Sequence, residues 1–127
     1  MPEEKANALL IEWQKRLFIT EWQIELNPNC NPDDMDLDGL SGQVEYTYEN
    51  KAARIDILDE KYYGSRVSEF DFEQILLHEM LHLKFCIFTD SGNLVQDRLI
   101  HQYIDEFARA LVDAKRSGEM NNAGTKG

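Results

Sequence analysis

One stretch of the chain reads Leu76-Leu77-His78-Glu79-Met80-Leu81-His82-Leu83, with three polar residues set among apolar ones. The spacing of the surrounding apolar residues predicts a helix over residues 68–88, with Ser68 at its start. Apolar side chains cover nearly the whole circumference of this helix, which is typical of a buried helix. His78, Glu79 and His82 fall within an arc of roughly 100°. Because a buried polar group costs several kcal/mol without a partner, these three side chains need a partner inside the fold.

The spacing of the two histidines indicates a metal ion. Residues i and i+4 lie one turn apart on the same helix face, so the His78 and His82 rings can bind one ion. Glu79 is offset from the ligand positions but within reach of a water on that ion. A carboxylate beside such a water can accept its proton, which is the chemistry that attacks an amide carbonyl. The alternative is a pair of core histidines bonded to neighbouring carbonyls or carboxylates.

His101, the third of three histidines in the chain, is the predicted third ligand. The residues between His82 and His101 suffice for the helix to end, for a turn at 90–93, and for a last helix over 94–115 to return antiparallel. His101 lies at the edge of that helix's apolar stripe. Three protein ligands with an open fourth position are the catalytic arrangement of zinc. Asp105, one turn later, can accept the other ring proton of His101. If His101 is instead a surface residue, the remaining candidates are Asp97, Asp105 and Glu106.

The rest of the chain predicts a small α+β domain. We expect an amphipathic helix over residues 3–18 and a half-buried strand over 22–26 that Pro28 and Pro32 end. Two alternating runs within residues 44–58 indicate a β-hairpin. The expected fold is an N-terminal helix, a short antiparallel sheet with a hairpin, the active-site helix and a ligand-bearing C-terminal helix.

The length and composition bound the architecture. With 127 residues the chain has room for one domain, expected over residues 1–116, and the small polar tail over 117–127 is expected to be disordered. The net charge of −11 repels nucleic-acid backbones and anionic membranes and favours cations. No apolar stretch is long enough to span a membrane, and no signal-peptide core is present. Because Cys30 and Cys86 are too few for a disulfide framework, we expect a cytoplasmic protein.

The motif His78-Glu79-x-x-His82, a hairpin before it and a third ligand on a following helix resemble the zincin metallopeptidases. The interval to His101 is similar to that in gluzincins, in which a Glu is the third ligand and an Asp one turn later supports it; here His101 and Asp105 stand in those places. A His in this role is closer to the SprT-like proteases, although Gln102-Tyr103 replaces the expected Gly and aromatic residue and no zinc ribbon is present. The small size is similar to that of phage and prophage metallopeptidases. The resemblance covers residues 22–111, and the five-residue motif is its specific part.

The resemblance implies a zinc-dependent peptidase of zincin-like fold. One zinc ion per chain would be held by His78, His82 and His101, with Glu79 as the general base. The substrate would be a peptide or protein lying along the sheet edge beside the active-site helix, so the hairpin over 44–58 is expected to line the cleft. The alternative is a non-catalytic zinc-binding adaptor or regulatory module on the same fold.

Several residues are weaker candidates. By position, the oxyanion stabiliser would be Tyr62, Tyr63 or Arg66, although connector packing explains these residues as well. Peptide deformylase is disfavoured because the surroundings of Cys30 do not resemble its cysteine motif, and a metal-dependent RNase is disfavoured by the charge.

A second pattern, Asp34-x-Asp36-x-Asp38-Gly39 followed by Glu45, matches the EF-hand calcium loop. An EF-hand loop joins two helices, whereas a proline precedes this segment and a strand follows it. We therefore expect a solvated acidic loop, with a helix-free calcium site as the alternative.

Overall fold

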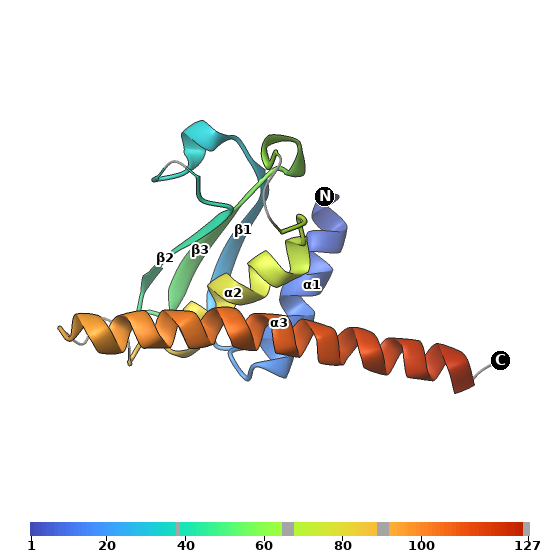
Figure 1. Cartoon of the computed structure of the whole chain (residues 1–127). Coiled ribbons are helices and arrows are strands. Elements are labelled where there is room, and N and C mark those ends of the chain that lie inside the picture. The colour runs from blue at the N-terminus through green and yellow to red at the C-terminus, as the bar shows by residue number, and fades with distance from the viewer. Residues whose placement is uncertain (38, 65–67, 89–91, 126–127) are drawn as a thin grey trace.

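The computed structural model describes residues 1–37, 39–64, 68–88 and 92–125, which form three α-helices and a three-stranded sheet (Figure 1). The predicted α+β class is therefore confirmed. The helices and strands, in chain order, are α1 (Glu3–Arg16), β1 (Gln23–Cys30), β2 (Gly42–Thr47), β3 (Ala52–Leu58), α2 (Phe72–Lys84) and α3 (Leu94–Thr125). Two short 3-10 turns, η1 (Pro32–Asp34) and η2 (Glu60–Tyr62), follow β1 and β3.

The sheet is mixed rather than antiparallel. Its order is β1-β3-β2; β3 pairs antiparallel with β2, which confirms the hairpin, and parallel with β1. The predicted antiparallel sheet is therefore wrong for β1. The alternation of apolar residues predicts which side chains are buried, but it does not specify the neighbour or the direction of a strand.

β1 also continues past Pro28, where the sequence predicted that it would end. A proline has no N–H to donate, which an edge strand tolerates because only one of its sides is paired. The pairing with β3 is irregular between Asn27 and Cys30, the interval that contains Pro28. Position in the sheet therefore overrides the usual effect of proline on a strand.

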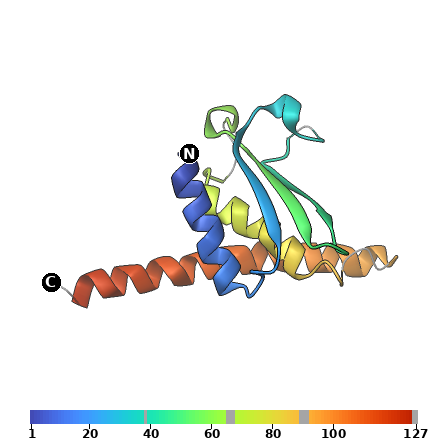
Figure 2. The same ribbon diagram turned by 180° about the vertical axis from the view of Figure 1, so that it is seen from behind.

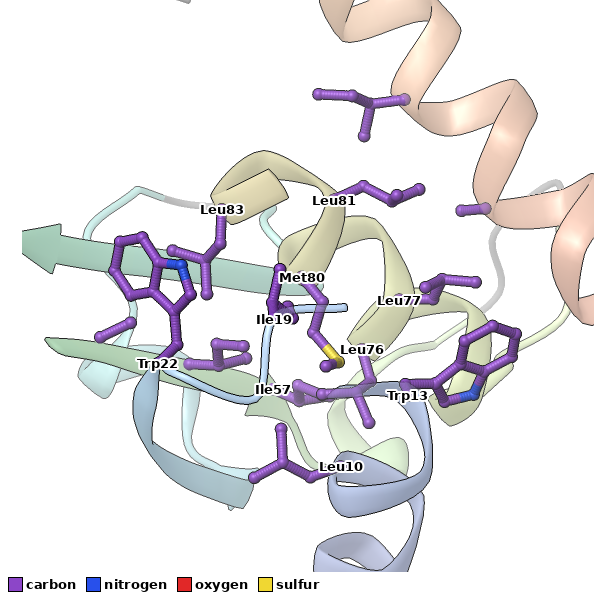
Figure 3. Close-up of a cluster of buried hydrophobic side chains, with 14 of the residues drawn as sticks. Leu10, Trp13, Ile19, Trp22, Ile57, Leu76, Leu77, Met80, Leu81 and Leu83 are labelled. Atoms are coloured by element: carbon purple, nitrogen blue, oxygen red, sulfur yellow. The ribbon is translucent and has the colours of Figure 1, made fainter. Parts of the chain in front are cut away.

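α2 lies at the centre of the molecule and is buried on two sides. Seen from behind, α1 and α2 cover one face of the sheet, and α3 lies across α2 (Figures 1 and 2). Leu76 and Met80 of α2 point toward the sheet, whereas Leu77 and Leu81 point toward α3 (Figure 3). All four are at most 3% exposed, as are three residues of the facing side of α3: Ile104, Ala108 and Val112. The prediction of a buried helix is confirmed.

α2 is shorter at both ends than the predicted 68–88. Asp71, not Ser68, is the N-cap, because its carboxylate accepts a hydrogen bond from the Gln74 N–H at 3.2 Å. The helix ends at Lys84, and Phe85 is its C-cap. The prediction was too long at this end because the apolar residues after Lys84 continue the helical spacing, although they are not helical.

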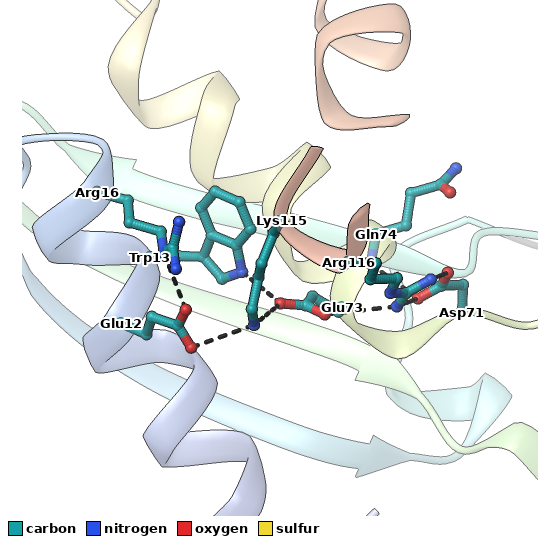
Figure 4. Close-up of polar contacts among 8 residues, drawn as sticks. All are labelled: Glu12, Trp13, Arg16, Asp71, Glu73, Gln74, Lys115 and Arg116. Atoms are coloured by element: carbon teal, nitrogen blue, oxygen red, sulfur yellow. Dashed lines mark hydrogen bonds and ion pairs between the residues drawn. The ribbon is translucent and has the colours of Figure 1, made fainter. Parts of the chain in front are cut away.

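α3 continues to Thr125, so residues 117–125 of the predicted disordered tail are helical, and residues 126–127 of that tail lie outside the described residues. Its C-terminal half is tied to the other helices by a polar network (Figure 4). The Glu73 carboxylate accepts hydrogen bonds from the Trp13 indole N–H at 2.7 Å and from Lys115, and Arg116 binds Asp71 through two hydrogen bonds of 2.7 and 3.0 Å. This network links α1, α2 and α3 and holds α3 in one position along α2.

No helix within the described ranges combines the length and the apolar character needed to cross a lipid bilayer.

Candidate metal centre

The three histidines of the chain lie together where α3 crosses α2. One ring nitrogen from each of His78, His82 and His101 lies within 4.8 Å of the other two. The ring centroids are 5.0 to 5.2 Å apart in all three pairs. Among the described residues, this is the one group of three or more His, Cys, Asp or Glu side chains close enough to bind a single ion. The structure thus brings together the three side chains that the sequence predicted to be metal ligands.

Two packing surfaces place these rings. His78 and His82 lie one turn apart on α2 and are half-buried, whereas His101 comes from α3 and is exposed. Because α3 packs on α2 through its buried residues Ile104 and Ala108, the adjacent turn of α3 carries His101 to the α2 histidines. Helical spacing fixes the first two ligands, and helix–helix packing fixes the third.

The protonation of the α2 rings suits metal binding. Burial, reinforced by the nearby charge of His78 and then of His101, lowers the pKa of His82 to about 4. Burial and the charge of His101 also lower the pKa of His78, against the opposing effect of Asp105. Both rings are therefore neutral at pH 7, and a neutral imidazole is the form that binds a metal.

Asp105 supports a different histidine from the one predicted. Its Oδ1 lies 3.5 Å from Nδ1 of His78, and its Oδ2 lies 2.9 Å from the guanidinium of Arg109. The predicted contact with His101 is thus replaced by one with His78. A carboxylate at Nδ1 leaves Nε2 of His78 as the metal-facing nitrogen, which is the usual support for a ligating histidine.

The donor set fits zinc. Nε2 of His78 and Nε2 of His82 are 3.3 Å apart. Tetrahedral zinc with Zn–N bonds of about 2.0–2.1 Å requires ligand nitrogens roughly 3.3–3.4 Å apart. Imidazole nitrogens are typical zinc ligands, whereas ions that prefer oxygen ligands, such as Mg²⁺ and Ca²⁺, fit a group of three histidines poorly.

Glu79 is a buried carboxylate beside this cluster. Its residue is 7% exposed, and no hydrogen bond or ion pair joins its carboxylate to any other described residue. Burial raises its pKa to about 7. A carboxyl group that titrates near neutral pH is well suited to accept and return a proton.

A cleft follows β2 and contains Glu79. It consists of two hollows that share Leu40, Gly42 and Glu79 in their walls. The larger, about 960 Å³, reaches His78 and His101; the smaller, about 270 Å³, reaches His82. β2 is an edge strand, so the edge that faces away from β3 pairs with no strand in the described part of the chain.

Gly42 permits the close approach of β2 to α2, and the sequence analysis missed it. A Cβ at this position would lie 2.8 Å from Cγ2 of Ile75 and 3.3 Å from Cγ of Glu79. Only glycine fits there without a shift of the strand or the helix. In the sequence, Gly42 stands between a predicted loop and a run of alternating residues. A glycine there looks like an ordinary turn residue, so it did not indicate a close approach of strand and helix.

Two further cleft residues were missed. Arg109 lines the larger hollow and is paired with Asp105. Arg109 is about two helical turns beyond His101 on the same side of α3. The spacing between the two residues could therefore have predicted that Arg109 lies in the cleft. Tyr46 lines the smaller hollow, and the buried Trp22 contacts its ring edge-on at a centroid distance of 6.2 Å.

The weaker candidates separate in the structure. Tyr63 lines the larger hollow, whereas Tyr62 borders a different hollow beside Leu58. Arg66 lies outside the described residues. Asp97 and Glu106, the reserve ligands, are not members of the histidine group.

The calcium-loop pattern is not assembled in the described residues. Asp34 ends a 3-10 turn and accepts a hydrogen bond from the Asn31 N–H, and Glu45 pairs with Arg54 across the sheet. Of the described residues, Asp34, Asp36 and Glu45 form no cluster within reach of one ion; Asp38 lies outside the described residues.

The fold and the site stand without an identified relative. No protein-family model matches the chain, and no curated protein or solved structure shows significant similarity to it.

Proposed function

We propose that this protein is a zinc-dependent peptidase of zincin-like fold, in which His78, His82 and His101 hold one zinc ion and Glu79 is the general base. The observation that carries the proposal is the convergence of three histidine nitrogens within 4.8 Å beside a buried carboxylate. Three protein ligands leave one position open, as in catalytic rather than structural zinc sites.

The residues of the chain divide the chemistry among them. Zinc bound here would polarise the scissile carbonyl and lower the pKa of a water in its open position. Glu79 takes the proton from the attacking water and returns it to the leaving amine, which a pKa near 7 allows in both directions. Asp105 holds the tautomer and orientation of His78 through Nδ1.

The cleft supports an extended peptide as the substrate. A peptide running along the free edge of β2 would form backbone hydrogen bonds with that strand and pass Glu79 between the two hollows. The smaller hollow, walled by Leu40, Val44 and Tyr46, suits one apolar side chain of the substrate. The larger hollow contains Tyr63 and Arg109, which suits polar groups on the other side of the scissile bond.

Metal content tests the site. Purified wild type, His78→Ala and His101→Ala are dialysed against zinc and measured by elemental analysis. We expect one zinc per wild-type chain and loss from both variants. A wild type that takes up no zinc would refute the metal centre, and zinc that survives loss of His101 would remove His101 from the ligand set.

Hydrolysis tests the activity separately. Zinc-loaded wild type and Glu79→Gln are compared on a mixture of quenched fluorescent peptides. We expect Glu79→Gln to keep its zinc but to cleave about 10²–10⁴-fold more slowly, the usual contribution of a general base. A zinc-loaded wild type that cleaves no peptide would leave the non-catalytic zinc-binding module, and the peptidase proposal would fail.

A further inference from the structure

A second surface of the molecule is apolar, exposed and separate from the metal centre. It consists of five side chains of α3 and one that follows α2, each 37 to 68% exposed: Phe88, Val95, Leu99, Tyr103, Phe107 and Leu111. We name it the α3 stripe. Leu99, Tyr103, Phe107 and Leu111 repeat every four residues, beside the buried row that begins at Ile104. The helix therefore carries two parallel apolar rows, and the core covers only one of them.

The stripe has a defined shape. Tyr103 stacks on Phe107 at a centroid distance of 6.2 Å, and Phe107 lies 6.5 Å from Phe85. Beside this aromatic ridge is a hollow of about 510 Å³, with Phe88, Leu99 and the two ridge residues in its wall. A ridge next to a groove is the arrangement that lets one surface pack against a copy of itself.

We propose that the α3 stripe is the interface of a homodimer, in which the α3 helices of two copies cross antiparallel about a two-fold axis near Gln102. In such an interface the same patch serves both subunits, so the ridge of each copy enters the groove of the other. Rows of side chains spaced four apart interdigitate when two helices cross in this way.

The exposed apolar area of the α3 stripe is large enough for a stable dimer interface. At roughly 150–250 Å² for a fully exposed large side chain, the exposed parts of the six stripe residues come to on the order of 600 Å². A standard interface buries about 800 Å² per partner, of which about two thirds is apolar in homodimers. The stripe thus supplies the apolar share of such an interface, and it reaches the upper limit of apolar patches found on monomers.

The charges beside the stripe favour the antiparallel arrangement. Arg98 and Glu106 are both exposed and lie eight residues apart, about 12 Å along α3, on either side of Gln102. Rotation about an axis at Gln102 places each Arg98 at the same height along the helices as Glu106 of the second copy. A parallel arrangement would instead place like charges together, which is unfavourable.

Dimerisation leaves the metal centre open. His101 and Tyr103 are two residues apart, so their side chains leave α3 on opposite faces, roughly 200° apart. The cleft along β2 is lined by the His101 face. The dimer therefore does not depend on zinc, and its failure would not affect the proposed peptidase activity.

Sedimentation of the metal-free full chain tests the proposal from micromolar to submillimolar concentration. We expect wild type to reach twice the monomer mass of 14.8 kDa. The Tyr103→Glu/Phe107→Glu double variant should raise the dimer Kd at least about 100-fold, because aromatic residues at the centre of an interface dominate binding. Ile11→Glu on α1, at a site 53% exposed, is the matched control and should dimerise as wild type does. A wild type that stays monomeric, or a double variant that dimerises equally well, would overturn the proposal.

Cross-linking tests the geometry without altering the stripe. The native Cys30 and Cys86 are buried, so an introduced surface cysteine is the accessible thiol. With a bifunctional thiol cross-linker that can span two packed helices about 8–10 Å apart, we expect Gln102→Cys, level with the axis, to form a covalent dimer. Asp113→Cys, exposed on the same helix but far from the axis, should remain monomeric on denaturing gels. Equal cross-linking of the two variants would contradict the antiparallel crossing.

Discussion

Two glutamates on α2 are buried equally and behave oppositely. Glu73 is 8% exposed and Glu79 is 7% exposed, and they lie six residues apart on one helix. Although burial raises the pKa of Glu73, the hydrogen bonds from Lys115 and Trp13 outweigh it, and the net pKa is lowered. Burial raises the pKa of Glu79 to about 7 with nothing to oppose it. The same residue type at the same depth is thus an ion-pair anchor in one place and a neutral-pH acid or base in the other.

The difference shows that partners, not depth, define the role of a buried carboxylate. Glu73 is satisfied and holds three helices together, so its ionised form stabilises the fold. Glu79 is left without a counter-charge in the described structure, which costs stability but keeps its proton exchangeable. A group that destabilises the fold while facing a cleft is typical of a functional site.

The largest expected effect comes from removing the satisfied carboxylate. Glu73→Ala should lower the free energy of unfolding by about 3–5 kcal/mol, because the 7%-exposed side chain of Lys115 loses its main partner. Urea denaturation measures the change. Glu119→Ala, at an exposed site on the same helix as Lys115, is the control and should stay within about 0.5 kcal/mol of wild type. A loss below about 1 kcal/mol would show that Glu73 is not an anchor.

Removing the charge of Glu79, the carboxylate without a partner among the described residues, should instead raise the free energy of unfolding. The folded-state pKa of Glu79 is about 7, above its ordinary 4.5, so the folded state prefers the protonated form. Stability of the metal-free protein is therefore lost as the pH rises from 4.5 through 7. Glu79→Gln, which stays neutral, should be more stable than wild type by about 3 kcal/mol at pH 9 and equal to it at pH 4.

Thermal unfolding in the presence of a chelator measures this difference across the pH range. A variant that is less stable than wild type at pH 9 would mean that Glu79 has a stabilising partner.

A substitution at Gly42 tests the close packing of β2 against Ile75 and Glu79 of α2. Gly42→Ala places a methyl group 2.8 Å from Ile75 and 3.3 Å from Glu79, so β2 or α2 must shift. Overpacking of this kind should cost about 1–3 kcal/mol and slow any peptide hydrolysis. Gly118→Ala in α3 has nothing within 4 Å of the added Cβ and should instead stabilise by up to about 1 kcal/mol. Chemical denaturation of the pair measures both, and equal behaviour would refute the close approach.

The smallest expected effect on stability comes from the ion pair between Asp71 and Arg116, which belongs to the same network as Glu73. Burial raises the pKa of Asp71, but hydrogen bonds from Arg116 and the Gln74 N–H outweigh it and lower the pKa below its ordinary value of 3.8. A carboxylate with a lowered folded-state pKa stabilises the fold above its unfolded pKa and loses this contribution as the pH falls through the folded pKa.

Arg116→Gln should therefore cost about 1 kcal/mol at pH 7, a modest value because the Arg116 side chain is 46% exposed. The cost should disappear below the folded pKa of Asp71, where the carboxyl is protonated. Parallel urea titrations at both pH values measure it, and a cost independent of pH would assign the effect to packing rather than charge.

Much of the fold and of the site followed from the sequence, because local periodicity contains it. The buried helix, the hairpin and the α+β class came from the spacing of apolar residues. His78, Glu79 and His82 were placed by helix geometry alone, since their relative positions depend only on rise and rotation per residue. His101 was predicted from the length of one helical hairpin, and the histidine cluster in the structure agrees with that prediction.

Long-range packing decided the rest, because local spacing carries no information about it. The parallel pairing of β1 depends on which edge of β3 was free, not on the pattern of β1 itself. Asp105 contacts His78 instead of His101 because of the crossing of α3 over α2. Gly42 and Glu79 meet only when β2 lies against α2.

The contrast between Glu73 and Glu79 is the clearest case. In the sequence the two flanking histidines single out Glu79, but nothing near Glu73 indicates that its charge has a partner. Lys115 lies forty-two residues away from Glu73 and reaches it only because α3 extends past residue 112 along the molecule. The sequence by itself determined that a carboxylate and two imidazoles share one buried helix. The tertiary structure decided which buried carboxylate has a counter-charge and which has none, because electrostatic partners are set by distance in space rather than along the chain.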